Sequence, residues 1–167
     1  MDRTALKPAM EAALNVQANA ELWSAYLYLS MSYDMRSKGY DGIACWYAAQ
    51  AKEEQTHAEK LLSYLSSRGG RVSLQPIEAV PQDWASPAAA FADTAKHENL
   101  VTNRIYELVD MAVELKDYAT QIFLQWYVSE QVEEENTARK YADALQKIGS
   151  HEAALIAFDK ELGARLG

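Results

Sequence analysis

The chain has 167 residues, 49% of them hydrophobic, which is enough for one compact domain with a full core over residues 1–167. Its formal net charge is −8 and its pI about 4.9, so the surface should attract cations and repel phosphate backbones and anionic membranes. Nucleic acid and membranes are therefore not expected partners. The single cysteine, Cys45, rules out an intrachain disulfide, suits a reducing cytosol and is expected to be a small buried residue. With no export signal or long apolar run, we expect a cytoplasmic protein.

Capping signals divide the chain into four long helices and a short fifth. We expect these helices over residues 5–37, from 41 to about 68, from 87 to about 115, from 118 to 148, and from 150 to about 164. Ser86-Pro87 offers an N-cap followed by proline at the first helical position, and Asp117 offers a cap for the fourth helix. Gly39 and Gly69 follow the first two helices, as is typical of helix C-termini.

The segment of residues 70–85 contains Pro76 and Pro81 and shows no helical period. At about 3.3 Å per extended residue it can cover ~50 Å, whereas a helix of about 28 residues is ~42 Å long. This linker can therefore run the full length of a bundle. We expect an all-α fold in which two antiparallel helical hairpins form a four-helix bundle joined by one long crossover.

Polar residues interrupt the apolar stripe that should face the core in each of the four long helices. In residues 43–65, Glu54 and His57 stand one helical turn apart at positions where apolar residues are expected. The inner stripes of the other three helices are interrupted in the same way, by Glu21, by Glu98, and by Gln131 with Glu134. Four helices thus point at least one acid at a single core.

Four ionised carboxylates left uncompensated in an apolar interior would each cost several kcal/mol, which is comparable to the stability of a whole domain. Two divalent cations would neutralise the four acids, with neutral His57 completing the ligand set. Carboxylates with a Glu-x-x-His motif are the groups that di-iron and di-manganese bundles project inward, and mixed oxygen and nitrogen ligands suit these metals. The alternative is that the helices are out of phase and the acids face solvent.

The chain resembles the bacterial-type, non-haem ferritins in four runs that together span most of its length: ELWSAYLYLSM, AKEEQTHAEKL, KHENLVTNRIYEL and FLQWYVSEQVEEE. The resemblance implies a ferritin-like four-helix bundle with a short fifth helix. It also implies iron storage and detoxification by a ferroxidase that oxidises ferrous iron with dioxygen or peroxide at an intrasubunit di-iron centre. Ferric mineral would then be deposited inside a homo-oligomeric shell of twenty-four subunits.

The resemblance also assigns roles to individual residues. Glu21, Glu54 and His57 match the ligands of a first iron, and Glu54, Glu98 and Glu134 those of a second, with Glu54 bridging and Gln131 lining the centre. Glu53, Glu130 and Glu133 match a third, weaker iron site, although their spacing alone is equally typical of a solvated acidic face. Tyr28 matches a tyrosine that can hydrogen-bond a ligand and supply an electron. Trp126 could supply another, but a plain core aromatic is the simpler interpretation.

Differences between this sequence and related families narrow the expected cofactors and ligands. No haem is expected, because Gln55 stands where haem-binding relatives carry methionine and only one Glu-x-x-His motif is present. His97 and His151 lie outside the matched set and are expected to be surface or capping residues. Two alternatives stay open, namely a non-storage di-iron oxidase or peroxidase on the same fold and a metal-free helical scaffold.

The expected fifth helix is too apolar for a free tail, since it carries Leu155, Ile156 and Phe158. Four long helices already fill the interior of one bundle. We therefore expect the fifth helix to dock against the bundle and against the fifth helices of neighbouring copies around a symmetry axis.

Overall fold

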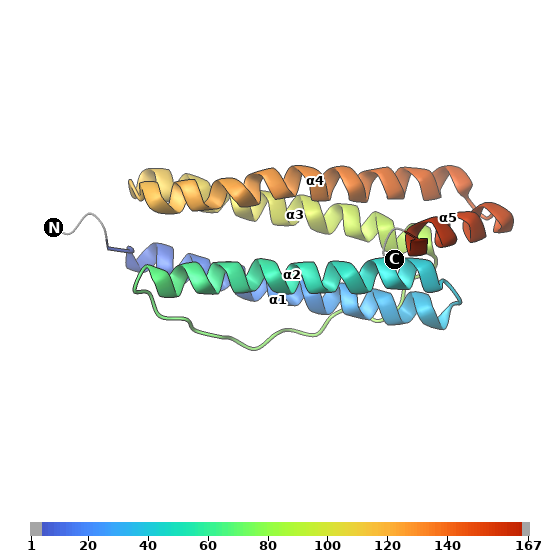
Figure 1. Cartoon of the computed structure of the whole chain (residues 1–167), viewed down its shortest axis with the longest axis horizontal. Helices are drawn as coiled ribbons and strands as arrows, with labels where there is room; N and C mark the ends of the chain where they lie inside the picture. The colour runs from blue at the N-terminus through green and yellow to red at the C-terminus, as the bar shows by residue number, and fades with distance from the viewer. Residues whose placement is uncertain (1–4, 165–167) are drawn as a thin grey trace.

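The computed structural model describes residues 5–164, which form five helices and no strand. The helices are α1 (Pro8–Ser37), α2 (Asp41–Ser67), α3 (Pro87–Glu114), α4 (Tyr118–Ile148) and α5 (Glu152–Ala164). The pair α1 and α2 and the pair α3 and α4 are antiparallel hairpins that lie along one another, and α5 crosses one end of the bundle (Figure 1). The predicted all-α four-helix bundle with a short fifth helix is confirmed.

The helix ends agree with the capping signals at most positions. Ser86 Oγ accepts a hydrogen bond from Ala89 N at 3.1 Å, and Asp117 Oδ1 accepts one from Thr120 N at 3.2 Å. The first helix begins at Pro8 rather than at residue 5. Lys7 before it is extended, with ψ 141°, because a residue that precedes proline is disfavoured in the helical region.

The fifth helix also begins later than expected, at Glu152 instead of residue 150. His151 Nδ1 accepts a hydrogen bond from Ala154 N at 3.3 Å, so the ring caps the first turn. His151 was expected to be a surface or capping residue, and this exposed histidine is both.

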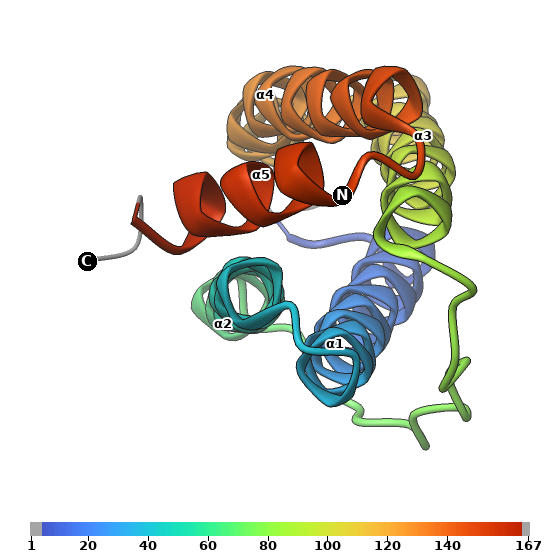
Figure 2. The ribbon, with the colours of Figure 1, turned by 90° about the vertical axis from the view of Figure 1, so that its right-hand side faces the viewer.

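The linker between α2 and α3 follows the outside of α1 (Figures 1 and 2). Near its start, Asn15 Nδ2 donates to Arg71 O at 2.9 Å, and further along, Ser30 Oγ donates to Pro81 O at 2.6 Å. These bonds fix an extended segment that has no secondary structure of its own. The predicted crossover along the bundle is confirmed.

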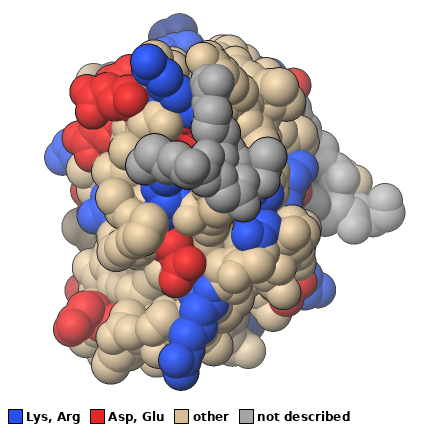
Figure 3. Space-filling model, turned by 90° about the vertical axis from the view of Figure 1, so that its left-hand side faces the viewer, with Lys and Arg blue, Asp and Glu red and all other residues tan. Residues whose placement is uncertain are grey.

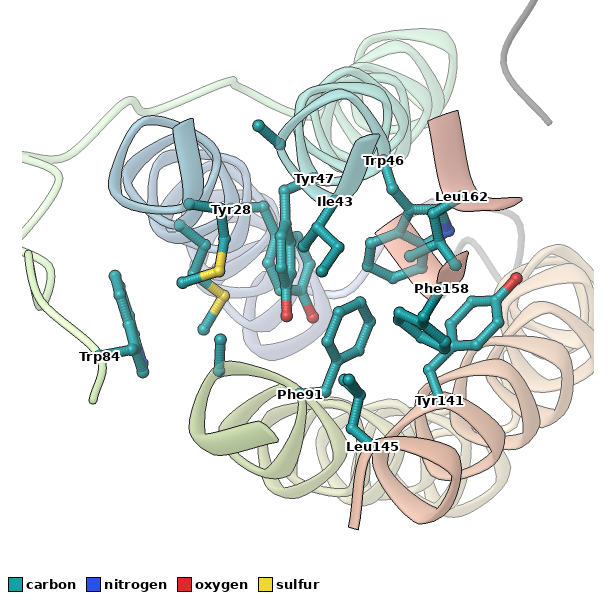
Figure 4. Close-up of a cluster of buried hydrophobic side chains, with 14 of the residues drawn as sticks. Tyr28, Ile43, Trp46, Tyr47, Trp84, Phe91, Tyr141, Leu145, Phe158 and Leu162 are labelled. Atoms are coloured by element: carbon teal, nitrogen blue, oxygen red, sulfur yellow. The ribbon is translucent and has the colours of Figure 1, made fainter. Parts of the chain in front are cut away.

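The apolar core falls into two clusters at the two ends of the bundle. The aromatic cluster lies at the α5 end and includes Tyr28, Trp46, Tyr47, Phe91, Tyr141 and Phe158, whose rings meet mainly at tilted or edge-to-face angles (Figure 4). The aliphatic cluster at the other end includes Leu14, Leu61, Leu65, Ile105 and Leu124. Between the two clusters lies a belt of buried polar residues, which we call the polar belt. Its members are Glu21, Glu54, His57, Glu98, Gln131 and Glu134.

Helix α5 docks on the bundle of its own chain. Phe158 and Leu162 are buried in the aromatic cluster, and Asp159 Oδ1 accepts a hydrogen bond from Ile43 N at 2.8 Å, in the first turn of α2. A Cβ added to Gly42 would lie 1.8 Å from Asp159 O, so this close crossing requires glycine. Docking against the bundle is confirmed, whereas contact with other copies stays a prediction.

One core prediction was wrong, because Cys45 is exposed. It lies on the outer side of α2, while its neighbours Ala44 and Trp46 face inward. Sequence chemistry suggested burial because free cysteine behaves as a small apolar residue, but the phase of the helix decides otherwise.

Charged residues of both signs are scattered over the end of the bundle opposite α5 (Figure 3). Figure 3 shows Lys and Arg interspersed with Asp and Glu on that face. At the end of α2, Arg68 Nη1 lies 3.1 Å from Asp117 Oδ1. This ion pair joins the hairpin of α1 and α2 to the start of α4. Within residues 5–164, no helix has the length and apolar character that crossing a membrane requires.

Candidate metal centre

The polar belt collects side chains from all four long helices at mid-bundle. Glu21 comes from α1, Glu54 and His57 from α2, Glu98 from α3, and Gln131 with Glu134 from α4. Each of these six side chains is buried. The helices are therefore in the phase that the sequence pattern indicated, and the acids do not face solvent.

Three of these side chains converge closely enough to share one cation. One ligand atom from each of Glu21, Glu54 and His57 lies within 4.8 Å of the other two. His57 Nδ1 is 3.2 Å from Glu54 Oε2 and 3.9 Å from Glu21 Oε2. This arrangement brings two carboxylates and one imidazole nitrogen to a common point, as a site for iron, manganese or zinc requires.

A second convergent group uses the same histidine. His57, Glu130 and Glu134 place one ligand atom each within 4.8 Å of one another, and His57 Nε2 lies 3.9 Å from Glu130 Oε1. The two ring nitrogens thus face different carboxylates. The structure places Glu130 beside the belt, whereas Glu53 and Glu133 are exposed and belong to neither group.

One oxygen in the centre has no hydrogen-bond partner among the described residues. Glu21 Oε2 is buried and accepts no hydrogen bond from any of residues 5–164. Its sister atom Oε1 accepts a hydrogen bond from Gln17 Nε2 at 2.8 Å. A buried carboxylate oxygen without a donor is costly, and a cation bound between Glu21, Glu54 and His57 would satisfy it. The residues present therefore fit a metal ion.

Glutamine amides hold three of the carboxylates in place. Each donates one hydrogen bond to a different acid: Gln17 to Glu21 at 2.8 Å, Gln50 to Glu134 at 3.0 Å, and Gln131 to Glu98 at 3.2 Å. Sequence reasoning assigned no site role to Gln17 or Gln50. Their positions in the sequence could have indicated this role. Gln17 precedes Glu21, and Gln50 precedes Glu54, by one helical turn on the same buried face.

Two tyrosines add hydrogen bonds from the flanks of the belt. Tyr28 Oη donates to Glu98 Oε1, and Tyr127 Oη donates to the backbone oxygen of His57 at 2.6 Å. Trp126 packs edge-on against the His57 ring with centroids 5.4 Å apart, and Lys60 Nζ lies 3.6 Å from the centre of the indole. Glu98 is thus oriented by Tyr28, and the ring of His57 is held from the side of α4.

Comparison with known proteins decides the family. Residues 11–148 match the Ferritin-like domain. The chain belongs to the ferritin family. It is 40% identical to a bacterial non-heme ferritin of Bacteroides fragilis over 156 residues, which cover 93% of this chain and 97% of the relative. A bacterial non-heme ferritin of Staphylococcus epidermidis is 40% identical over 160 residues, 96% of each chain. The predicted resemblance to bacterial non-haem ferritins is confirmed.

Solved structures give the same result for the fold. An open pore ferritin from the archaeon Archaeoglobus fulgidus superposes with a TM-score of 0.95 at 49% identity, covering 95% of this chain and 98% of that one. Iron storage is therefore the general function of the family to which this chain belongs.

Burial sets the protonation of this ferritin's carboxylates. It raises the pKa of Glu54 well above its usual value, with the charges of Glu21 and Glu98 adding to the effect. Burial likewise raises the pKa of Glu98 to about 7 and that of Glu134 to about 8. In the absence of a cation these groups retain protons near neutral pH, so a metal ion that binds them must displace protons.

The prediction that His97 is an ordinary surface or capping residue was wrong, because it is half-buried between α1 and α3 and contacts Ser24. Its Nε2 lies 2.7 Å from Ser24 Oγ, and its ring centroid is 5.4 Å from that of Trp23 and 5.9 Å from that of Tyr28. Burial, with the nearby cation of Arg104, lowers the pKa of His97 to about 4, so the ring is neutral at physiological pH.

Proposed function

We propose that this ferritin stores and detoxifies iron by oxidising ferrous ions at a di-iron centre in the polar belt. The observation that carries the proposal is the buried convergence of Glu21, Glu54 and His57, with an unpartnered oxygen on Glu21, in a chain of the ferritin family. Hard oxygen ligands with one imidazole suit iron in both oxidation states.

Ferrous iron is the substrate in this proposal. Glu21 and His57 hold the first ion, Glu98 and Glu134 hold the second, and Glu54 lies between them as the bridging carboxylate, with Gln131 alongside. Two ions balance the four carboxylate charges and displace the protons that burial keeps on Glu54, Glu98 and Glu134. Because the acids are held in a rigid core, the two ions are kept close enough to react with one oxidant molecule.

The reaction is a two-electron transfer. Two ferrous ions become two ferric ions, and their electrons reduce hydrogen peroxide with two protons to two molecules of water, or dioxygen with two protons to hydrogen peroxide. Tyr28, hydrogen-bonded to Glu98, would supply one electron and its phenolic proton in place of one ferrous ion, leaving a tyrosyl radical that a later ferrous ion reduces. Pairing the electrons avoids the release of superoxide.

We also propose a third iron site and storage in a shell. Glu130, Glu53 and Glu133 would bind the third ion, and the inclusion of Glu130 in a convergent group with His57 and Glu134 supports a site next to the centre. The single domain would assemble into a homo-oligomeric shell of twenty-four subunits in the cytoplasm without haem. The relatives named as non-heme ferritins support the absence of haem, and the open pore ferritin supports an assembled shell.

Anaerobic titration with ferrous iron, followed by mixing with oxidant, tests the proposal. We expect two or three ferrous ions per chain, rapid oxidation, and large particles that keep ferric mineral when measured by scattering. Binding of no ferrous iron would favour the metal-free scaffold. Rapid oxidation by small particles that retain no mineral would favour a non-storage di-iron oxidase or peroxidase.

A further inference from the structure

A pocket of about 330 Å³ opens between α1, α3 and the linker. Its walls are mainly apolar and include Ala20, Trp23, Leu100 and Val101. Figure 2 shows the linker passing on the outer side of α1 and α3, away from α2 and α4. The pocket therefore opens on the opposite side of the bundle from the acidic residues of α2 and α4.

The inner end of the pocket lies one layer of side chains from the metal centre. Ser24 and His97 form part of its lining and are joined across α1 and α3 by the 2.7 Å contact between Ser24 Oγ and His97 Nε2. Behind them stands Tyr28, whose ring is 5.9 Å from that of His97 and whose hydroxyl bonds to Glu98. A small molecule in the pocket is thus separated from Glu98 only by this layer.

The charges around the pocket do not suit a ferrous ion. Among its lining residues, Glu78 on the linker is the one acid and Arg104 on α3 is the one cation. A divalent cation would have to give up hydration beside a guanidinium group with a single carboxylate to replace the water, which is unfavourable. On the other side of the bundle, the exposed acids Glu53 and Glu133, with Glu130 beside them, attract cations toward the centre.

We propose that the α1–α3 pocket admits the uncharged oxidant, hydrogen peroxide or dioxygen, while ferrous ions approach from the acidic side formed by α2 and α4. The inference rests on the proposed ferroxidase function and concerns how its second substrate arrives. Hydrogen peroxide finds hydrogen-bond partners in Ser24, His97 and Asn19, and dioxygen is accommodated by the apolar walls. Separate routes keep the bound oxidant away from incoming ferrous ions until both reach the centre.

Filling the pocket tests this inference. Leu100→Trp blocks its rim and Ala20→Phe fills its wall, so two independent variants probe the same space. Val113→Trp is the matched control, because Val113 lies on the same helix as Leu100 and is 51% exposed, against 50% for Leu100, without lining the pocket. Steady-state oxidation of ferrous iron is measured against peroxide and against dioxygen, and ferrous binding is measured anaerobically in each variant.

We expect a severalfold rise in KM for at least one oxidant in both filled variants and none in Val113→Trp, with the rate at saturating oxidant and the ferrous stoichiometry unchanged. A rise for peroxide alone or for dioxygen alone identifies the oxidant that uses the pocket. Unchanged KM for both oxidants in folded variants would overturn the inference, as would weakened ferrous binding with unchanged KM. If the wild-type chain oxidised no ferrous iron, the proposed function would fail first and the inference with it.

Discussion

The aromatic cluster and the polar belt are built from the same faces of the same helices, seven residues apart. Each acid of the belt lies two turns from a ring of the cluster: Glu21 from Tyr28, Glu54 from Tyr47, Glu98 from Phe91, and Glu134 from Tyr141. Seven residues in the other direction the same faces carry Leu14, Leu61, Ile105 and Tyr127 of the second cluster. Along each of the four helices, the buried face is therefore apolar toward both ends and acidic in the middle.

This difference separates stability from function along the bundle. The rings of the aromatic cluster bury apolar surface and meet edge to face, which stabilises the fold without any bound ion. The belt places carboxylates that repel one another in an equally buried environment. Their raised pKa values reflect the free-energy cost of ionising them there. The clusters thus hold the helices in register around the belt that we propose to bind iron.

The largest expected effect comes from removing a ligand of the belt. Glu54→Ala or His57→Ala should abolish fast ferrous oxidation, because Glu54 is the proposed bridge and His57 the one imidazole of the centre. The metal-free fold should be kept, and its thermal stability should hold or rise in Glu54→Gln, because a neutral amide of similar volume replaces a buried acid whose ionised form Glu21 and Glu98 repel. Stopped-flow absorbance measures the oxidation, and calorimetry measures the melting temperature.

Glu59→Ala serves as the control, since Glu59 is an exposed acid on the same helix. Oxidation at the wild-type rate in both Glu54→Ala and His57→Ala would show that the belt is not the catalytic centre.

The aromatic cluster should respond in the opposite way. Phe91→Ala removes a ring that contacts Trp46, Tyr47 and Phe158 and is expected to lower the free energy of unfolding by about 3–5 kcal/mol. The ferrous stoichiometry of the folded protein should not change. Urea unfolding of the metal-free chain measures the loss, and Val113→Ala, at an exposed site on α3, should change stability by less than about 0.5 kcal/mol. A loss of iron sites without a loss of stability would contradict the division between cluster and belt.

The sequence predicted the helices, the crossover and the belt because these features depend on local signals. Ser86, Asp117 and the glycines mark helix ends whatever the helices pack against, and the helical period identifies the inward face. Glu21, Glu54, His57 and Glu98 were found because an acid or histidine on that face conflicts with an apolar core.

Partners across the bundle could not be predicted in this way. The hydrogen bond from Gln50 to Glu134 joins residues 84 positions apart, and the contact of Ser24 with His97 joins residues 73 positions apart. The spacing of residues within one helix therefore cannot predict either contact. Cys45 was misjudged because its residue type was given more weight than its position on the helix, and His97 because it lay outside the residues matched to the family. Which acids could share one cation also depends on how the hairpins pack, and this packing brings Glu130 to His57 and leaves Glu53 and Glu133 outside both groups.

A smaller effect is expected from the amides that orient the carboxylates. Gln50→Ala removes the donor that holds Glu134 Oε2 at 3.0 Å and should weaken ferrous binding about 10–100-fold. Gln55→Ala is the matched control on the same helix, because Gln55 donates to Glu59 at the exposed surface. Anaerobic titration compares the two variants. Equal affinities would mean that Glu134 needs no orientation by Gln50.

The smallest effect is a dependence of stability on pH that a bound cation should remove. Glu98 and Glu134 have pKa values raised from 4.5 to about 7 and about 8, so the folded metal-free chain holds protons that the unfolded chain releases. Their contribution is fully present below about pH 4.5 and is lost as the pH rises through about 7 and 8. His97 acts in the opposite sense, because its pKa is lowered from 6.5 to about 4 and its contribution is lost as the pH falls through that range.

The interval from about pH 6.5 to about 8 therefore isolates the carboxylates of the belt. Over that interval, calorimetry of the metal-free protein should show the melting temperature falling by several degrees, with a smaller fall in Glu134→Gln, which carries no titrating group at that position. Saturation with a redox-inert divalent cation such as zinc should flatten the curve or reverse its slope, because the cation competes with protons for the same oxygens. A metal-free protein whose melting temperature rose across this interval would mean that the belt does not retain protons, and the proposed exchange of protons for ferrous ions would be wrong.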